Sequence, residues 1–244
     1  MKFHDIDSKV YVGYSNSGVL ALIPNTARKV LDVGCGAGDN AKHLKQLGVV
    51  VDGVTLSERE ALVAASYCRK VYVYDLEEGL PDLSGEIYDC VICSHVLEHI
   101  RFPSKLLQDI RSILTGDGSF VVALPNIMYY KNRYELLMGR FEYQETGLMD
   151  STHFRWYTFK TAQRLLQEHD YTKVLAFADG NFPLPLLRRV MPKSIAGWVD
   201  SMASRLVPGL FGYQMLFVYT KSGRKDSNRF AKRIKSWRGG NRPS

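Results

Sequence analysis

The chain has 244 residues, of which 45% are hydrophobic and 23% are charged, and its formal net charge is +7. This length supports one α/β domain with a core of its own, and the composition is that of a globular protein. No apolar stretch reaches the roughly 18 residues that a membrane-spanning helix needs. The first residues also lack the apolar centre of a signal peptide, so we expect a cytoplasmic protein.

The positive charge is concentrated at the carboxyl end. Residues 221–244 hold nine Lys or Arg and one Asp, a charge of +8, which leaves −1 for the other 220 residues. In this segment Phe230, Ile234 and Trp237 fall at helical spacing between basic residues. This basic amphipathic pattern indicates either a solvated, unstructured end or contact with a membrane surface, and RNA binding also remains open. We therefore divide the chain into a main domain over residues 1–220 and a basic tail.

Four cysteines occur, at positions 35, 68, 90 and 93. Cys90 and Cys93 form a C-x-x-C pair, but they fall inside a predicted strand, where residues three apart point to opposite faces. They cannot easily share a metal ion, and no second pair completes a zinc site. We expect small buried thiols in a reducing compartment.

The first 125 residues alternate between short apolar runs and amphipathic segments. After a polar and aromatic start, residues 15–23 predict a short helix that Pro24 ends. The rest predicts strands at 30–33, 49–54, 71–74, 87–93 and 119–124, helices at 39–47, 57–69 and 103–114, and a turn at 116–118. This alternation predicts an α/β fold with a parallel, doubly wound sheet.

Polar residues gather where these strands end. The glycines of 34–38 follow the first strand, Thr55 the second, Asp75 the third, and Ser94 and His95 the fourth. Ligands of doubly wound sheets bind at the carboxyl ends of the strands. The sequence therefore predicts one ligand site along this edge.

Residues 125–158 interrupt the alternation with a run rich in aromatic and charged residues. A long insertion after the fifth strand would lie above the ligand edge, where it would act as a lid over a substrate or pack its aromatic residues underneath. A helix over 159–169, a strand over 173–178, an amphipathic segment over 195–207 and a strand over 213–220 complete the prediction.

The glycine-rich turn has the form Asp32-x-Gly34-x-Gly36-x-Gly38. Glycines at the end of a strand let a ligand approach the main chain, and the following helix start offers unpaired N–H groups. The dinucleotide fingerprint would place a glycine at position 39 and an acid at the end of the second strand. The chain has Asp39 and Thr55 there, so a NAD site is disfavoured.

Taken with five further stretches, this turn resembles the class I S-adenosylmethionine (SAM)-dependent methyltransferases of the UbiG-like, Methyltransf_23 kind. The stretches that carry the resemblance are residues 30–38, 75–78, 88–99, 114–120, 124–126 and 152–158. The last has the Thr-His-x-Arg-x-x-Thr form of bacterial members often associated with glycan or cell-envelope pathways. The resemblance implies a Rossmann-like, seven-stranded sheet with an antiparallel last strand.

The resemblance also implies a role for individual residues toward SAM. Gly34, Cys35, Gly36 and Gly38 would line its methionine half, and Asp32 would hold its amino group. Tyr14 would approach the carboxylate, Asp75 and Leu76 the adenine, and Ser94 and His95 the sulfonium, with Thr55 and Leu56 at the ribose. Thr55 departs from the acid usual in the family, so Glu58 or Glu60 would have to substitute, or the affinity would be lower.

An oxygen acceptor also needs a group that removes its proton, and His95, His99 and His153 are the candidates. His153 is favoured because it lies in the insertion. Residues 95–99 match the H-x-x-E-H motif of inverted zinc proteases, but that motif belongs in a long helix and here follows a strand. We assign no metal, although Glu98, His99 and His153 form an alternative set for a divalent ion.

The sequence thus predicts a SAM-dependent methyltransferase that acts on oxygen in a small-molecule, glycan or lipid-linked acceptor. A base N-methyltransferase would carry Asn/Asp-Pro-Pro-aromatic after the fourth strand, where this chain has residues 94–97, so nucleic acid is disfavoured. The alternatives are an RNA methyltransferase that uses the tail and a non-catalytic SAM-binding accessory protein.

Overall fold

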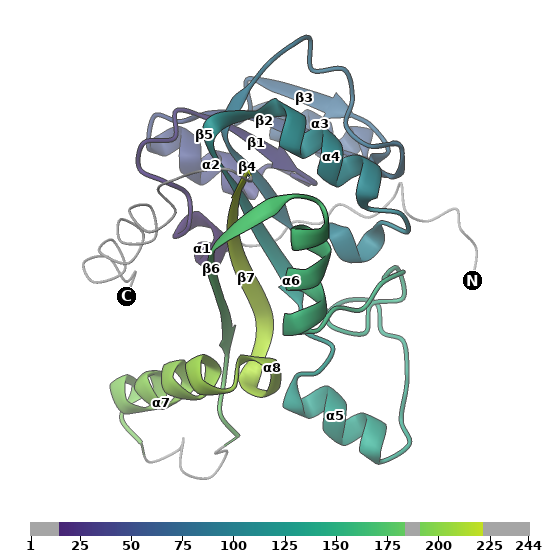
Figure 1. Ribbon diagram of the computed structural model, residues 1–244, viewed down its shortest axis with the longest axis vertical. Coiled ribbons are helices and arrows are strands. Elements are labelled where there is room, and N and C mark those ends of the chain that lie inside the picture. Colours follow the sequence, from purple (N-terminus) through teal and green to yellow (C-terminus); the bar gives the residue numbers. More distant parts are fainter. Residues whose placement is uncertain (1–14, 184–190, 222–244) are drawn as a thin grey trace.

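The computed structural model describes residues 15–183 and 191–221 (Figure 1). Its centre is a seven-stranded sheet with the order β3-β2-β1-β4-β5-β7-β6. The strands are β1 (Lys29–Val33), β2 (Val50–Thr55), β3 (Lys70–Val73), β4 (Tyr88–Ser94), β5 (Leu114–Pro125), β6 (Tyr171–Gly180) and β7 (Gly212–Lys221). Strands β1 to β5 pair in parallel, whereas β7 runs antiparallel to β5 and β6. The expected doubly wound sheet with an antiparallel last strand is confirmed.

Helices cover both faces of the sheet and create two apolar cores. Apolar residues of α1 (Ser17–Leu20), α2 (Asp39–Gln46) and α3 (Glu58–Ala64) join one core. Those of α4 (Ser104–Ile113) and α6 (Phe159–Glu168) join the other. Cys90 belongs to the first core and Cys93 to the second, and all four cysteines are buried free thiols. The C-x-x-C pair therefore points to opposite faces, as its position in a strand predicts.

Two local predictions were wrong. Helix α3 ends at Ala64 and does not reach Arg69, because the N–H of Arg69 bonds to the Val51 carbonyl as the chain enters β3. The expected turn at 116–118 is a bulge in β5, since Tyr88 pairs with Leu114 and Cys90 pairs with Ser119. The strand thus starts five residues early and loops out before it resumes pairing.

The insertion after β5 contains α5 (Tyr130–Leu137) and a long irregular segment. Helix α5 buries none of its residues and projects away from the sheet (Figure 1). The segment then returns to the sheet, because the N–H groups of Phe154 and Arg155 both donate to the Glu98 carbonyl, at 2.9 and 3.0 Å. Its far end is thereby held against the turn that follows β4.

The remaining elements are α7 (Lys193–Leu206), α8 (Pro208–Phe211), and the 3-10 turns η2 (Leu76–Glu78) and η3 (Leu97–His99) that follow β3 and β4. Among the residues that the structure describes, no helix is both long and apolar enough to cross a membrane. Tyr14 and residues 222–244 lie outside the described ranges, so the predictions made for them stay predictions.

Candidate active site at the carboxyl edge of the sheet

The glycine-rich turn after β1 has an unusual backbone. Gly34, Gly36 and Gly38 have φ of 75°, 51° and 86°, the left-handed region that other residues avoid. A Cβ on Gly34 would lie 2.3 Å from Cγ2 of Val96. The side chain of Cys35 is buried against Gly53 and Cys68, so a ligand at this turn would meet the main chain.

Asp32 lies directly before this turn, only 1% exposed. Its Oδ2 accepts a hydrogen bond of 3.3 Å from Nδ2 of Asn40, but its Oδ1 has no partner. Burial raises the pKa of Asp32 to about 7, although the hydrogen bond from Asn40 lowers it. A buried carboxylate oxygen without a donor is costly, which makes this position a receptor for a cation or an N–H group.

An acidic side chain from helix α3 lies beside the end of β2. Thr55 is buried, and its hydroxyl donates to Oε2 of Glu60 at 2.6 Å. Glu60 is 6% exposed and belongs to α3, whose first turn is capped by Ser57. Glu58 and Leu56 are both exposed. Of the two proposed substitutes for the missing acid, only Glu60 stands beside Thr55.

Beyond β3, Asp75 is exposed and caps η2 through the N–H of Glu77, while Leu76 is buried. Both residues sit at the carboxyl edge, as expected from their position after the strand. Ser94, at the end of β4, accepts a hydrogen bond of 3.2 Å from Nδ2 of Asn16.

His95 follows β4 with φ of 56°, a conformation that is uncommon outside glycine and is often found at functional sites. Its Nδ1 lies 3.2 Å from Oε1 of Glu98, and its Nε2 lies 2.9 Å from Oε1 of Gln214. Desolvation by the neighbouring groups disfavours the charged ring, although 40% of the side chain is exposed, and the Glu98 carboxylate outweighs this effect, so the pKa of His95 is raised. Both ring nitrogens thus face acceptors, which suits the protonated ring.

Two residues of this network were missed in the sequence. Gln214 exchanges hydrogen bonds with Asn16, 198 residues away, so that His95, Gln214, Asn16 and Ser94 form one chain of contacts along the edge. Asn16 also caps α1. A usable signal existed for Gln214, because it is an amide at the start of an otherwise apolar strand.

A second histidine group lies next to His95. The rings of His99 and His153 pack edge to face with centroids 4.8 Å apart, beside the fully buried Glu98. Glu98, His99 and His153 each offer one ligand atom, and these atoms lie within 4.8 Å of one another. The structure therefore brings together the set that the sequence suggested as an alternative for a divalent ion. Residues 97–99 form a 3-10 turn after a strand, which is not the long helix of a zinc protease.

The stretch from 152 to 158 serves this group. The Thr152 hydroxyl donates to Oδ1 of Asp150 at 2.7 Å and lies 3.0 Å from Nδ1 of His99, and the Thr152 carbonyl lies 3.2 Å from the same nitrogen. Arg155 donates to the Arg101 carbonyl, and Thr158 caps α6. Thr152, Arg155 and Thr158 of the Thr-His-x-Arg-x-x-Thr form thus each have a structural task.

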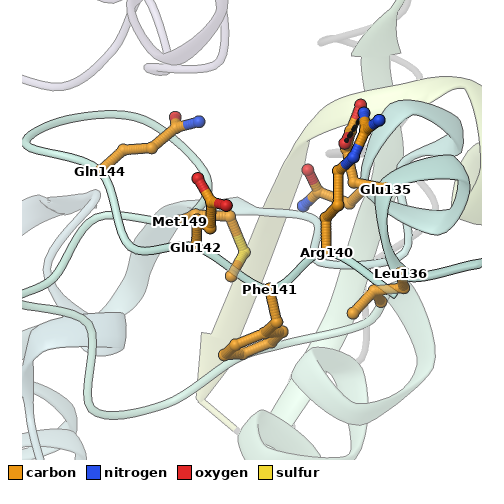
Figure 2. A pocket seen from close by; sticks show the side chains of 8 residues that line it. Glu135, Leu136, Arg140, Phe141, Glu142, Gln144 and Met149 are labelled. Atoms are coloured by element: carbon orange, nitrogen blue, oxygen red, sulfur yellow. Dashed lines mark hydrogen bonds and ion pairs between the residues drawn. The ribbon is translucent and has the colours of Figure 1, made fainter. Parts of the chain in front are cut away.

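A surface pocket lies elsewhere, within the insertion. Figure 2 shows Arg140 beside Glu135 on one side of it and Phe141 below; Asn132, Leu136, Glu142, Gln144 and Met149 complete its lining. Arg140 and Glu135 form an ion pair of 3.2 Å. No residue of the glycine-rich turn lines this pocket.

Comparison with known proteins agrees with this geometry. A family model described as a methyltransferase domain matches residues 15–176. The ubiquinone biosynthesis O-methyltransferase of Haemophilus ducreyi is 29% identical over 135 residues, which is 52% of this chain and 56% of that protein. The chain thus spans about half the length of the curated relatives it matches.

Solved structures share the fold at lower identity. A SAM-dependent methyltransferase from Archaeoglobus fulgidus is 22% identical with a TM-score of 0.58, over 81% of this chain and 87% of that one. An O-methyltransferase of a Brevibacillus brevis polyketide synthase, in complex with S-adenosyl-L-homocysteine, is 18% identical with a TM-score of 0.51, over 93% and 78%. Because the family model covers well over half of the residues, the chain belongs to the methyltransferase-domain family.

Proposed function

We propose that this protein transfers a methyl group from SAM to an oxygen atom of a small-molecule, glycan or lipid-linked acceptor. The observation that carries the proposal is the unpartnered Oδ1 of buried Asp32 next to three left-handed glycines. The methionine half of SAM carries a cationic amino group, which would supply the missing donor. Family membership and the O-methyltransferases among its relatives support the same reaction.

The other residues at the carboxyl edge of the sheet would each contact a different part of SAM. Glu60, held by Thr55, would take the ribose hydroxyls in place of the usual strand-end acid. Asp75 and Leu76 would lie by the adenine, and Ser94 near the sulfonium. Tyr14, which we expect at the carboxylate, lies outside the described residues.

Methyl transfer asks for positioning more than for reactive protein groups. SAM supplies an activated methyl group on its sulfonium, and the acceptor oxygen forms a bond to that carbon as the carbon–sulfur bond breaks. The acceptor must also lose a proton. Holding donor and acceptor in line is the main contribution of the protein, and a base adds to it.

Among the three histidines, the geometry favours His99 and His153 over His95 as the proton acceptor. The ring nitrogens of His95 both face acceptors. His99 donates through Nδ1 toward Thr152, which leaves the lone pair on Nε2. Burial lowers the pKa of His153, so its ring is neutral near pH 7. The proton would therefore leave toward the His99–His153 pair.

Labelled SAM and fractionated extract, with glycan and lipid pools included, test the reaction. We expect His153→Ala to lose most turnover at unchanged SAM affinity, and His169→Ala, whose ring binds the Leu165 carbonyl away from the cluster, to keep it. Full turnover of His153→Ala would contradict its role. Absence of a thermal shift at millimolar SAM would contradict the whole proposal and favour an accessory protein.

A further inference from the structure

Three aromatic side chains of the insertion form a cluster that belongs to neither apolar core. Phe141 packs edge to face on Tyr143 and on Trp156, with ring centroids 5.7 and 6.0 Å away, and Tyr143 and Trp156 are 6.2 Å apart. Phe141 is 50% exposed and Tyr143 is 56% exposed. The indole N–H of Trp156 has no hydrogen-bond partner among the residues that the structure describes. The cluster thus combines open aromatic surface with an unused donor.

The segment that carries Trp156 is anchored on both sides. The N–H of Arg155 bonds to the Glu98 carbonyl at 3.0 Å, and the Tyr157 carbonyl accepts a backbone N–H of the chain after β5 at 3.1 Å. His153, one of the two proposed proton acceptors, lies three residues before Trp156 on the same segment. The aromatic cluster is therefore built on the part of the insertion that is held against the carboxyl edge of the sheet.

The surface pocket of the insertion adjoins the cluster, because Phe141 belongs to both (Figure 2). Only Leu136 and Met149 are apolar among its other lining residues. The rest are polar, namely Asn132, Glu135, Arg140, Glu142 and Gln144. Their carboxylate, amide and guanidinium groups supply both hydrogen-bond donors and acceptors. A hydrocarbon chain bound here would remove these groups from water without pairing them, at a cost in free energy.

We propose that the aromatic cluster and the adjoining pocket bind a sugar unit of the methyl acceptor. A pyranose ring presents C–H groups on its face, which are attracted to the negative faces of aromatic rings. Its hydroxyl groups both donate and accept, which suits the polar lining. This inference rests on the proposed methyl transfer, and it narrows the acceptor to a saccharide. The bound unit would hold the acceptor while a hydroxyl of a neighbouring unit reaches the His99–His153 pair.

Saturation-transfer difference NMR tests the sugar site on the full chain without SAM. The probes are di- and trisaccharides of glucose, galactose, mannose, rhamnose and N-acetylglucosamine. We expect transfer to the ring C–H protons of at least one of them. Tyr143→Ala and Trp156→Ala should weaken its binding about 10-fold, since each removes one stacking surface. Tyr134→Ala is the matched control and should bind as the wild type does, because Tyr134 is 57% exposed on the same insertion but does not belong to the cluster.

Kinetics with labelled SAM and the saccharide that binds give a second readout. Tyr143→Ala should raise the KM for the saccharide about 10-fold and leave kcat nearly unchanged, because a contact remote from the reacting atoms is lost equally in the ground state and the transition state. Calorimetric titration of SAM into each variant shows whether it is folded with its cofactor edge intact. A fall in kcat with an unchanged KM would contradict a binding role for the cluster.

Two further results would overturn the sugar site. One is the absence of transfer to every saccharide with the folded wild type, or equal transfer with Tyr143→Ala, Trp156→Ala and Tyr134→Ala. The other is binding of catechol, a flat phenolic probe, at the cluster in the absence of saccharide binding, which would indicate an aromatic acceptor. Both leave SAM binding intact and the proposed methyl transfer standing. Saccharide binding by a wild type that does not bind SAM would instead contradict the proposed function.

Discussion

Two buried aspartates on neighbouring strands have opposite surroundings. Asp52 on β2 is fully buried, and it accepts hydrogen bonds of 2.9 Å from Nε of Arg69 and from the Tyr88 hydroxyl. Asp32 on β1 is as deeply buried but has one oxygen without a donor. A buried carboxylate that is paired within the protein is stabilised by its partners, whereas a buried carboxylate oxygen without a partner is available to a donor group of a ligand.

The same difference separates the two ends of the sheet. Asp52, Arg69 and Glu86 form a hydrogen-bonded charged cluster on the side of the sheet away from the glycine-rich turn. At the carboxyl edge, both Asp32 and Glu98 keep an oxygen without a hydrogen-bond partner. Four substitutions, taken in falling order of expected effect, test this difference.

Asp52→Ala should destabilise the fold without touching SAM binding. It leaves Arg69 and the buried Tyr88 hydroxyl without their acceptor, so we expect a loss of about 3–5 kcal/mol in the free energy of unfolding. Urea denaturation measures this, with exposed Asp82→Ala as the control, for which we expect less than about 1 kcal/mol. A reduced SAM affinity of the folded variant would remove the contrast between the two aspartates.

Asp32 should make the ligand-free protein less stable as the pH rises. Because its pKa is about 7 in the folded state against 3.8 when exposed, the folded chain binds more protons between these values. Stability from this residue is therefore lost as the pH rises from about 4 through 7, by an amount on the order of 3 kcal/mol. Urea unfolding of the wild type and of Asp32→Asn at pH 5 and pH 8 isolates the contribution of Asp32 to the stability. If the stability of both proteins changes equally with pH, the raised pKa of Asp32 is refuted.

Gly34 and Gly48 offer a matched pair, with φ of 75° and 74°. Alanine at Gly48 meets nothing within 4 Å, so we expect only the backbone cost of about 1 kcal/mol. Alanine at Gly34 must also displace Val96 and should cost about 2–3 kcal/mol in thermal or urea unfolding. Equal losses would mean that the turn is looser than the structure shows.

Glu60→Gln should weaken SAM binding about 10-fold, about 1.4 kcal/mol, because a carboxylate accepts two ribose hydroxyls and an amide does so less well. Glu58→Gln, in the same turn of α3 but exposed, should leave the affinity unchanged. Calorimetric titration compares the two. Equal SAM affinities of the two variants would mean that Glu60 does not bind the ribose hydroxyls, which would leave only Thr55 to contact them.

Much of this arrangement was predictable from local sequence. The alternation of strands and helices indicated the doubly wound sheet, and Asp32 with its three glycines indicated the edge at which we propose that SAM binds. The contact between Asn16 and Gln214 was not predictable, because only the fold brings together residues 198 positions apart. The grouping of His153 with Glu98 and His99, in contrast, was suggested from the sequence as an alternative set for a divalent ion. The bulge before Ser119 was also missed, since two glycines around an aspartate are typical of a turn.

The central claim is that Asp32 binds the amino group of SAM. Calorimetric titration of SAM into wild type and Asp32→Asn at pH 8 tests it most directly. We expect the variant, which keeps the shape but loses the charge, to bind about 30- to 100-fold more weakly, a loss of about 2–3 kcal/mol, while its ligand-free form is more stable than the wild type at that pH. Equal affinity in the two proteins would contradict the account.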